Sequence, residues 1–102
     1  MNWQIYIILC SDNSLYTGIT TDLERRFHQH AYGRGAKYFR GREPTEVMYL
    51  ERGHTRNTAV KRELQIKKMT RAGKYLLISS EMNEYSHIGV DTKTGESCFK
   101  RG

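Results

Sequence analysis

Five polar side chains in this chain have the chemistry needed to hydrolyse a phosphodiester. Tyr6 and Tyr16 lie in short strand-like segments, Arg26 and His30 lie in the helix-like segment that follows, and Glu63 lies in a later one. Arginine can bind a phosphate, phenols and an imidazole can move protons, and a carboxylate can hold Mg²⁺. The five residues therefore predict a phosphodiester-cleaving site with one metal ion, if the fold brings them together.

The register of the predicted hairpin decides whether the two tyrosines meet, because side chains alternate between the faces of a strand. A four-residue loop would place the two phenols on opposite faces. A three-residue loop, which pairs Cys10 with Ser14, would place them on one face with Gly18 opposite Tyr6. The prediction of a site requires this second register or a bulge. A glycine at that position would also leave room for a phosphate backbone.

The helical candidates depend on positions four residues apart. Arg26 and His30 have this spacing and project from the same face of a helix. Glu63 falls on the apolar side of the later predicted helix, where a buried carboxylate needs a partner or a metal ion. The alternative is an ordinary ion pair with Lys67, one turn later. Arg62 is expected on the outer, solvated face.

The apolar pattern predicts elements in the order β-β-α-β-α-α. The first strand is apolar on both faces, which is typical of a central strand. Thr21 and Glu24 have the spacing of a capping box at the start of the first helix, and Gly33 predicts its end. The other predicted elements are strands from Trp3 to Cys10, Leu15 to Thr20 and Thr45 to Glu51, and helices from about Thr55 to Met69 and from Arg71 to Ile78.

Residues 1–80 are predicted to form a single domain, and residues 81–102 a polar tail that is either a loose hairpin or disordered. The 102 residues are 37% hydrophobic and 27% charged, which suits one small globular fold.

The net charge of +6 favours a polyanionic partner, most simply nucleic acid. The longest apolar stretch is too short to span a bilayer, and no export signal is evident, so we expect a cytoplasmic protein without a membrane partner. Cys10 and Cys98 are far apart, which argues against structural zinc and against a disulfide scaffold. No small-molecule cofactor is expected.

A basic, glycine-rich loop at residues 33–44 carries aromatic residues among its cations. Its arginines and lysine can neutralise phosphates, and an aromatic ring could stack on an unpaired base. The alternative is a solvated loop whose aromatic rings pack under the sheet. With neighbouring residues included, the expected nucleic-acid contacts are Gly18, Arg25, Arg34, Lys37, Tyr38, Arg40 and Arg42.

The candidate residues also resemble, in order and spacing, the motifs of the GIY-YIG nuclease family. The resemblance covers roughly Trp3 to Ile78 and is strongest to small stand-alone bacterial members with a single domain. It implies an α/β (α+β) fold, with a three-stranded antiparallel sheet flanked by helices. The motifs are Gln4-Ile5-Tyr6, Tyr16-Thr17-Gly18, Leu23-x-x-Arg26-x-x-x-His30 and Glu63-x-x-Ile66-Lys67.

The resemblance also implies roles for the matched residues. Glu63 would be the protein ligand of one Mg²⁺ or Mn²⁺ ion, and Arg26 would bind the scissile phosphate. Tyr6 and Tyr16 would orient or deprotonate the attacking water, with His30 assisting. Which tyrosine is the base stays open.

Three departures from the family pattern concern positions around these motifs. Gln4 replaces the first glycine of the family, and Ile19 stands where some relatives carry a lysine. A late asparagine found in many members has no clear counterpart, since Asn83 lies too far along the chain.

The resulting prediction is a divalent-metal-dependent endonuclease that hydrolyses DNA phosphodiester bonds, in repair or recombination by analogy. The alternative is a catalytically inactive nucleic-acid-binding module with the same fold. A pure interaction domain is a third possibility. Neither RNA nor any particular DNA structure is excluded as the substrate.

Overall fold

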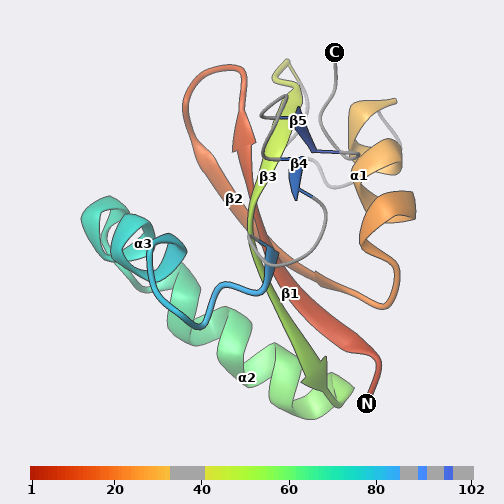
Figure 1. The fold of residues 1–102 in the computed structure, drawn as a ribbon, viewed down its shortest axis with the longest axis vertical. Helices are drawn as coiled ribbons and strands as arrows, with labels where there is room; N and C mark the ends of the chain where they lie inside the picture. The colour runs from red at the N-terminus through yellow and green to blue at the C-terminus, as the bar shows by residue number, and fades with distance from the viewer. Residues whose placement is uncertain (33–40, 86–89, 92–95, 98–102) are drawn as a thin grey trace.

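The computed structural model describes residues 1–32, 41–85, 90–91 and 96–97, and its centre is a three-stranded antiparallel sheet in the order β2-β1-β3 (Figure 1). The predicted fold class and element order are confirmed. No helix in these ranges is long and apolar enough to cross a membrane. The elements around the sheet are β1 (Trp3–Cys10), β2 (Leu15–Thr20), α1 (Leu23–Ala31), β3 (Pro44–His54), α2 (Arg56–Lys67) and α3 (Arg71–Ile78).

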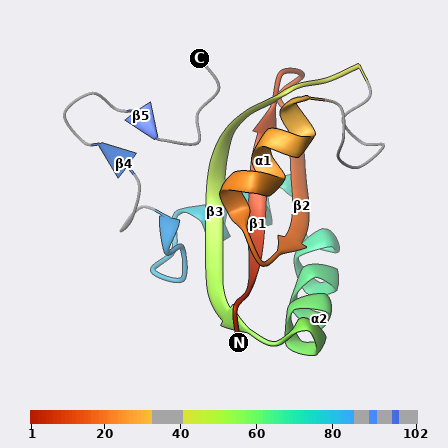
Figure 2. The ribbon, with the colours of Figure 1, turned by 90° about the vertical axis from the view of Figure 1, so that its right-hand side faces the viewer.

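Helices cover both faces of the sheet, α1 on one side and α2 with α3 on the other (Figures 1 and 2). This double covering explains why β1 is apolar on both faces. Its even-numbered residues face α1, and its odd-numbered residues face α2 and α3. The core on the α1 side contains Tyr6, Ile8, Cys10, Leu23, Phe27, Val47, Leu50 and Tyr85, and the other contains Ile5, Ile7, Leu15, Tyr49, Ala59, Ile66 and Leu77.

The hairpin between β1 and β2 adopts the register that brings the tyrosines together. The backbone N–H of Cys10 donates to the carbonyl of Ser14 at 2.9 Å, and Tyr6 lies opposite Gly18. Asn13 closes the three-residue loop with a φ of 67°, in the left-handed region that asparagine tolerates better than most residues. Because Tyr16 pairs with Ile8, both phenols face α1.

The start of α1 differs from the predicted capping box. Asp22 is the N-cap, and its side chain accepts a hydrogen bond from the backbone N–H of Arg25. The prediction based on Thr21 and Glu24 was wrong by one residue, because an aspartate caps as well as a threonine does. The helix ends at Ala31, and the residue predicted to stop it, at position 33, lies outside the described ranges.

The third strand is longer than predicted, and its outer edge is covered by residues of the predicted tail. Asn83 donates from Nδ2 to the carbonyls of Met48 and Ile78, both at 2.9 Å, and its Oδ1 accepts from the N–H of Leu50 at 3.2 Å. The N–H of Glu84 donates to the carbonyl of Leu50 at 2.9 Å. The bonds to Met48 and Leu50 satisfy backbone groups at the outer edge of β3 that would otherwise have no neighbouring strand to pair with.

The first residues of the tail therefore pack on the domain. Asn83 and Tyr85 are both 5% exposed, and Tyr85 joins the core on the α1 side. Further on, β4 (Val90–Asp91) and β5 (Glu96–Ser97) form a short antiparallel pair, as in a hairpin. The division into a domain at residues 1–80 and a tail at residues 81–102 stays a prediction.

Gly18 should be intolerant of any side chain, because a Cβ atom there would lie 2.5 Å from the hydroxyl oxygen of Tyr6 and 2.7 Å from its Cζ. We expect Gly18→Ala to lower the free energy of unfolding by about 1–3 kcal/mol, as overpacking does. Urea denaturation is the measurement.

The matched control is Gly73→Ala in α3, where the new Cβ would meet nothing closer than the hydroxyl oxygen of Thr70 at 3.3 Å. We expect a change within about 1 kcal/mol, since alanine is the better helix former. Equal destabilisation by both substitutions would contradict the proposed steric role of Gly18.

Candidate functional site

The candidate site lies at the β2 edge of the sheet. The ring of Tyr6 crosses over Gly18, so its hydroxyl reaches the edge strand although Tyr6 belongs to the central strand. There the hydroxyl oxygen lies 2.9 Å from Nε2 of His30, which projects from α1. The Tyr16 ring centroid lies 6.2 Å from that of Tyr6 and 5.3 Å from that of His30. Three of the five predicted residues thus form one aromatic cluster.

The space above Gly18 is filled by this cluster. A Cβ at that position would also lie 3.0 Å from a ring carbon of Tyr16. The missing side chain therefore makes room for the two phenols, whereas the sequence suggested room for a phosphate backbone. A direct contact between Gly18 and nucleic acid stays a prediction.

The cluster has a buried layer and a more accessible layer. Tyr6 is 1% exposed and His30 is 2% exposed, whereas Tyr16, Arg26 and Glu63 are half-buried. A molecule that binds at this edge would contact the three half-buried side chains first.

Burial controls the protonation of the inner layer. It raises the pKa of Tyr6 well above the ordinary value of 10, with smaller upward effects from Tyr16 and Glu63 that Arg26 partly opposes. Burial also lowers the pKa of His30 to about 4, and the Arg26 charge adds to that decrease. At neutral pH the phenol of Tyr6 is therefore protonated and the imidazole of His30 is neutral.

Arg26 is the cation of the site. Its guanidinium lies close enough to the phenol of Tyr6 to lower the pKa of that group, and its Nη1 donates to Oε1 of Gln29 at 3.0 Å. The bond to Gln29, three residues later on the same helical face, restricts the arginine rotamer. Arginine held in this way can bind a phosphate with two parallel hydrogen bonds.

Glu63 approaches the same edge from α2, which packs against β2 and β1 on the opposite side of the sheet. Its negative charge raises the pKa of Tyr6, so the carboxylate lies within electrostatic range of the phenol. Nζ of Lys67 lies 3.4 Å from its Oε2, which is the ion pair of the alternative interpretation. The ion pair is therefore present, and the role of Glu63 as a metal ligand stays a prediction. The Glu63 side chain is 18% exposed, and the Lys67 side chain, at 48%, lies nearer the solvent.

A single accessible carboxylate suits Mg²⁺ or Mn²⁺. These ions keep several waters and accept as few as one protein carboxylate together with phosphate oxygens. Among the described residues, no group of three histidines, cysteines or acidic residues could hold a metal ion. The donor set thus fits a hard, mostly hydrated cation with Glu63 as its protein ligand.

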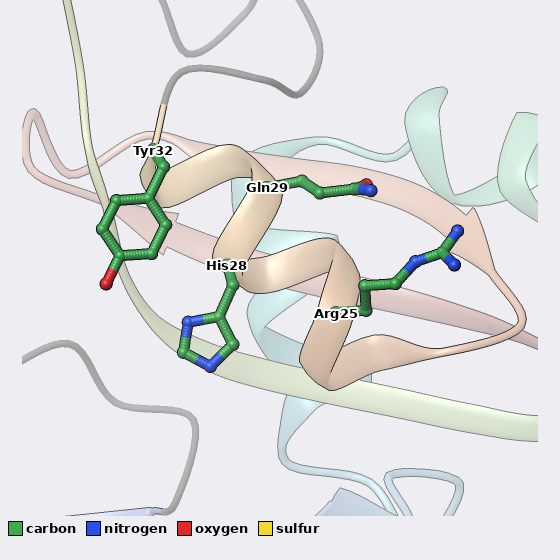
Figure 3. Close-up of a pocket in the computed structure, with 4 residues that line it drawn as sticks. All are labelled: Arg25, His28, Gln29 and Tyr32. Carbon is green, nitrogen blue, oxygen red and sulfur yellow. The ribbon is translucent and has the colours of Figure 1, made fainter.

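Arg25 is exposed on α1, one position before Arg26. Together with His28, Gln29 and Tyr32 it lines an open hollow of about 450 Å³ on the outer side of the helix (Figure 3). The rings of His28 and Tyr32 are stacked there, with centroids 6.2 Å apart. A contact of Arg25 with nucleic acid stays a prediction.

The other predicted nucleic-acid contacts belong to the basic loop. Nε of Arg42 forms an ion pair with Asp12 at 3.1 Å, which links the end of the loop to the β1–β2 turn. The remaining four, Arg34, Lys37, Tyr38 and Arg40, lie outside the described residues.

A buried ionic cluster at the end of β3 is a feature that the sequence analysis missed. Glu51 is 8% exposed, and its carboxylate accepts hydrogen bonds from the hydroxyl of Tyr49 at 2.6 Å and from Nε of Arg62 at 3.1 Å. Nε2 of His54 lies 2.6 Å from its other oxygen. Arg62 was expected on a solvated face, and this was wrong, because β3 continues past Glu51 and meets α2. The cluster fixes α2 one residue before Glu63.

The neutral state of His30 predicts a pH-dependent stability. Because its pKa is about 4 in the folded state and 6.5 ordinarily, the unfolded chain binds the proton more tightly between these values. The stabilisation is complete above pH 6.5 and is lost as the pH falls toward 4. Between pH 7 and pH 5 we expect a loss of about 2 kcal/mol in the free energy of unfolding.

His30→Gln should remove this loss, whereas His28→Gln, at an exposed position of the same helix, should retain it. Urea denaturation at the two pH values measures both variants. An unchanged pH dependence in His30→Gln would contradict the buried, neutral imidazole.

The Glu51 cluster predicts a second stability difference. Burial raises the pKa of Glu51, but the hydrogen bonds from Tyr49, His54 and Arg62 outweigh it and hold the pKa below its ordinary value. We expect Arg62→Met to lower the free energy of unfolding by about 1–3 kcal/mol, because it removes one of the donors to a buried carboxylate.

The matched control is Lys67→Met on the same helix, which breaks the more exposed pair with Glu63 and should cost less than about 0.5 kcal/mol. Thermal or urea denaturation compares the two. Similar losses in both variants would contradict the assignment of Arg62 as the anchor of α2.

Comparison with known proteins gives consistent matches across most of the chain. Residues 2–76 match the model of the GIY-YIG catalytic domain. A UPF0213 protein of Natronomonas pharaonis is 46% identical over 77 residues, which cover 76% of this chain and 91% of that protein. A UPF0213 protein of Clostridium perfringens is 49% identical over 81 residues, which cover 79% of this chain and 86% of that protein. The fold also matches the solution NMR structure of a UPF0213 protein from Bacillus halodurans, with a TM-score of 0.52. The two sequences are 40% identical, and the match covers 83% of this chain and 90% of that protein's chain.

Proposed function

The chain belongs to the GIY-YIG nuclease family, as its motifs predict, and on that premise we propose that it is a divalent-metal-dependent endonuclease that hydrolyses DNA phosphodiester bonds. The observation that carries the proposal is the convergence of two phenols, an imidazole, a guanidinium and a carboxylate at the β2 edge. A location in the cytoplasm and a role in repair or recombination are part of the proposal by analogy with the family.

The three half-buried side chains contact the substrate in this proposal. Arg26, already held by Gln29, binds the scissile phosphate and offsets the charge that develops on its oxygens during the reaction. Tyr16 is the more accessible phenol and contacts the attacking water. Water then attacks the phosphorus in line with the leaving oxygen.

Tyr6 and His30 support the reaction from the buried layer. The phenol of Tyr6 donates its hydrogen bond to Nε2 when the imidazole carries its proton on Nδ1. A neutral imidazole can take up a proton at Nε2, which a charged one cannot. Because the Tyr6 hydroxyl occupies the Nε2 lone pair, a proton that leaves the water reaches His30 only through Tyr6, whose oxygen takes up that proton as its own proton passes to Nε2.

Glu63 is the residue that would hold Mg²⁺ or Mn²⁺ through its carboxylate. The bound cation would neutralise charge on the phosphate and lower the pKa of nearby water and phenol. Lys67 competes for the same oxygen atoms, since its ammonium lies 3.4 Å from Oε2. Its half-exposed side chain can turn to the solvent at small cost.

Substitution of Glu63 tests the proposal most directly. We expect Glu63→Gln to reduce Mg²⁺- or Mn²⁺-dependent cleavage by at least about 100-fold, because a catalytic metal ion contributes several kcal/mol. In EDTA, the dissociation constant of Glu63→Gln for DNA should stay within about threefold of that of the unmodified protein. Labelled single-stranded, nicked and branched substrates are the assay.

Glu81→Gln is the control, since it removes the same charge from an exposed position and should retain activity. Full cleavage by Glu63→Gln would refute the proposal. If the unmodified protein binds DNA yet cuts none of the substrates with either metal, the chain is instead a binding module with the nuclease fold.

A further inference from the structure

A second hollow lies between the end of β2 and α1, and Arg26 is one of the residues that line it. Its volume is about 190 Å³, roughly six times the ~30 Å³ that a water molecule occupies in the liquid. It is therefore large enough for a chemical group rather than a single ion. The residues that line it include Trp3, Thr20, Thr21, Arg25, Arg26 and Gln29.

The lining of this hollow suits an anion. Two arginines, Arg25 and Arg26, line it together with Gln29 and the exposed Thr21. Arg25 and Gln29 also line the hollow of Figure 3, where their side chains extend from α1 in the same direction and away from the rings of His28 and Tyr32. No acidic side chain is among the described residues that line it.

Arg26 is common to this hollow and to the candidate catalytic site. Its charge acts on Tyr6 and His30, and Arg26 also lines the hollow. A phosphodiester bound at the catalytic site would therefore have the hollow next to it along the β2 edge. Successive phosphates of a nucleic-acid strand are separated by a single nucleotide, so the next phosphate would reach it.

We propose that this hollow is a binding subsite for the phosphodiester next to the scissile one, with Arg25 as its cation. The proposal rests on the proposed nuclease function and adds a specific contact beyond the cut bond. Trp3 borders the same space and packs against the sugar or base of the bound nucleotide. In this proposal Arg26 binds the scissile phosphate and Arg25 binds the next one, while the hydrogen bond to Gln29 restricts the rotamer of Arg26.

Trp3 gives this subsite its own reporter, because it is the only tryptophan in the chain. The guanidinium of Arg56 lies over its ring, 5.7 Å from the centroid, and holds the indole in place. A nucleotide entering the hollow should change the indole fluorescence. This signal requires no cleavage, so it can be measured with EDTA present.

The binding experiment is a fluorescence titration with short oligodeoxynucleotides at several salt concentrations. We expect Arg25→Ala to weaken binding and to reduce the slope of log K against log[salt] by about 0.7–0.9, the loss of one phosphate contact. Arg71→Ala removes the same charge from α3, on the opposite side of the sheet, and should leave the slope unchanged (Figure 1). An equal slope change in both variants, or none in Arg25→Ala, would overturn the proposal.

The cleavage experiment uses substrates in which one phosphate next to the cut carries an uncharged methylphosphonate. The unmodified protein should cut one of the two such substrates about tenfold more slowly, as expected for a lost charged hydrogen bond. Arg25→Ala should cut that substrate and the normal one at similar rates. If neither methylphosphonate slows cleavage by the unmodified protein, the subsite is refuted.

If the unmodified protein cuts nothing, the proposed nuclease function fails. The fluorescence titration still decides whether the hollow binds a phosphodiester.

Discussion

The site depends on one steric constraint, the absence of a side chain at position 18 beneath the ring of Tyr6. Tyr6 belongs to the central strand, and without this space its phenol could not extend across the edge strand. The hydroxyl then reaches His30 of α1 on one face of the sheet and comes within electrostatic range of Glu63, which approaches from the other. At this edge, groups from both helical layers can therefore act on one substrate.

The division between buried and accessible groups follows from the same packing. Tyr6 and His30 are shielded from water, so the phenol keeps its proton and the imidazole stays neutral. Arg26, Tyr16 and Glu63 stay partly exposed, and in the proposed function they are the side chains that contact the nucleic acid. Fixed, partly desolvated groups of this kind stabilise a charged transition state better than mobile groups in water do.

The sequence predicts the fold, and which candidate residues lie near one another, better than it predicts the contacts between side chains. Apolar alternation and helical spacing identify the elements, because burial imposes those periods on any sequence. The hairpin register could not be decided in advance, since it depends on the left-handed conformation of Asn13. The cap of α1 was misplaced because Thr21 and Asp22 are adjacent and both can cap a helix.

The ionic cluster at the end of β3 was missed for a different reason. A helical wheel places Arg62 among the polar residues of α2, and nothing local indicates that β3 extends far enough to offer it Glu51. Asn83 was likewise set aside as lying too far along the chain, although its side chain bonds to backbone groups of Met48, Leu50, Ile78 and Tyr85. Contacts between segments distant in the chain leave no periodic trace in the sequence.

The covering of the outer edge of β3 has a consequence for solubility. Backbone groups of Leu50 and Arg52 that a foreign strand would need are already bonded to Asn83 and Glu84. Exposed strand edges are the usual starting points for sheet-to-sheet aggregation. A protein shortened before Asn83 would uncover this edge, and we would expect it to self-associate even if its catalytic groups stayed intact.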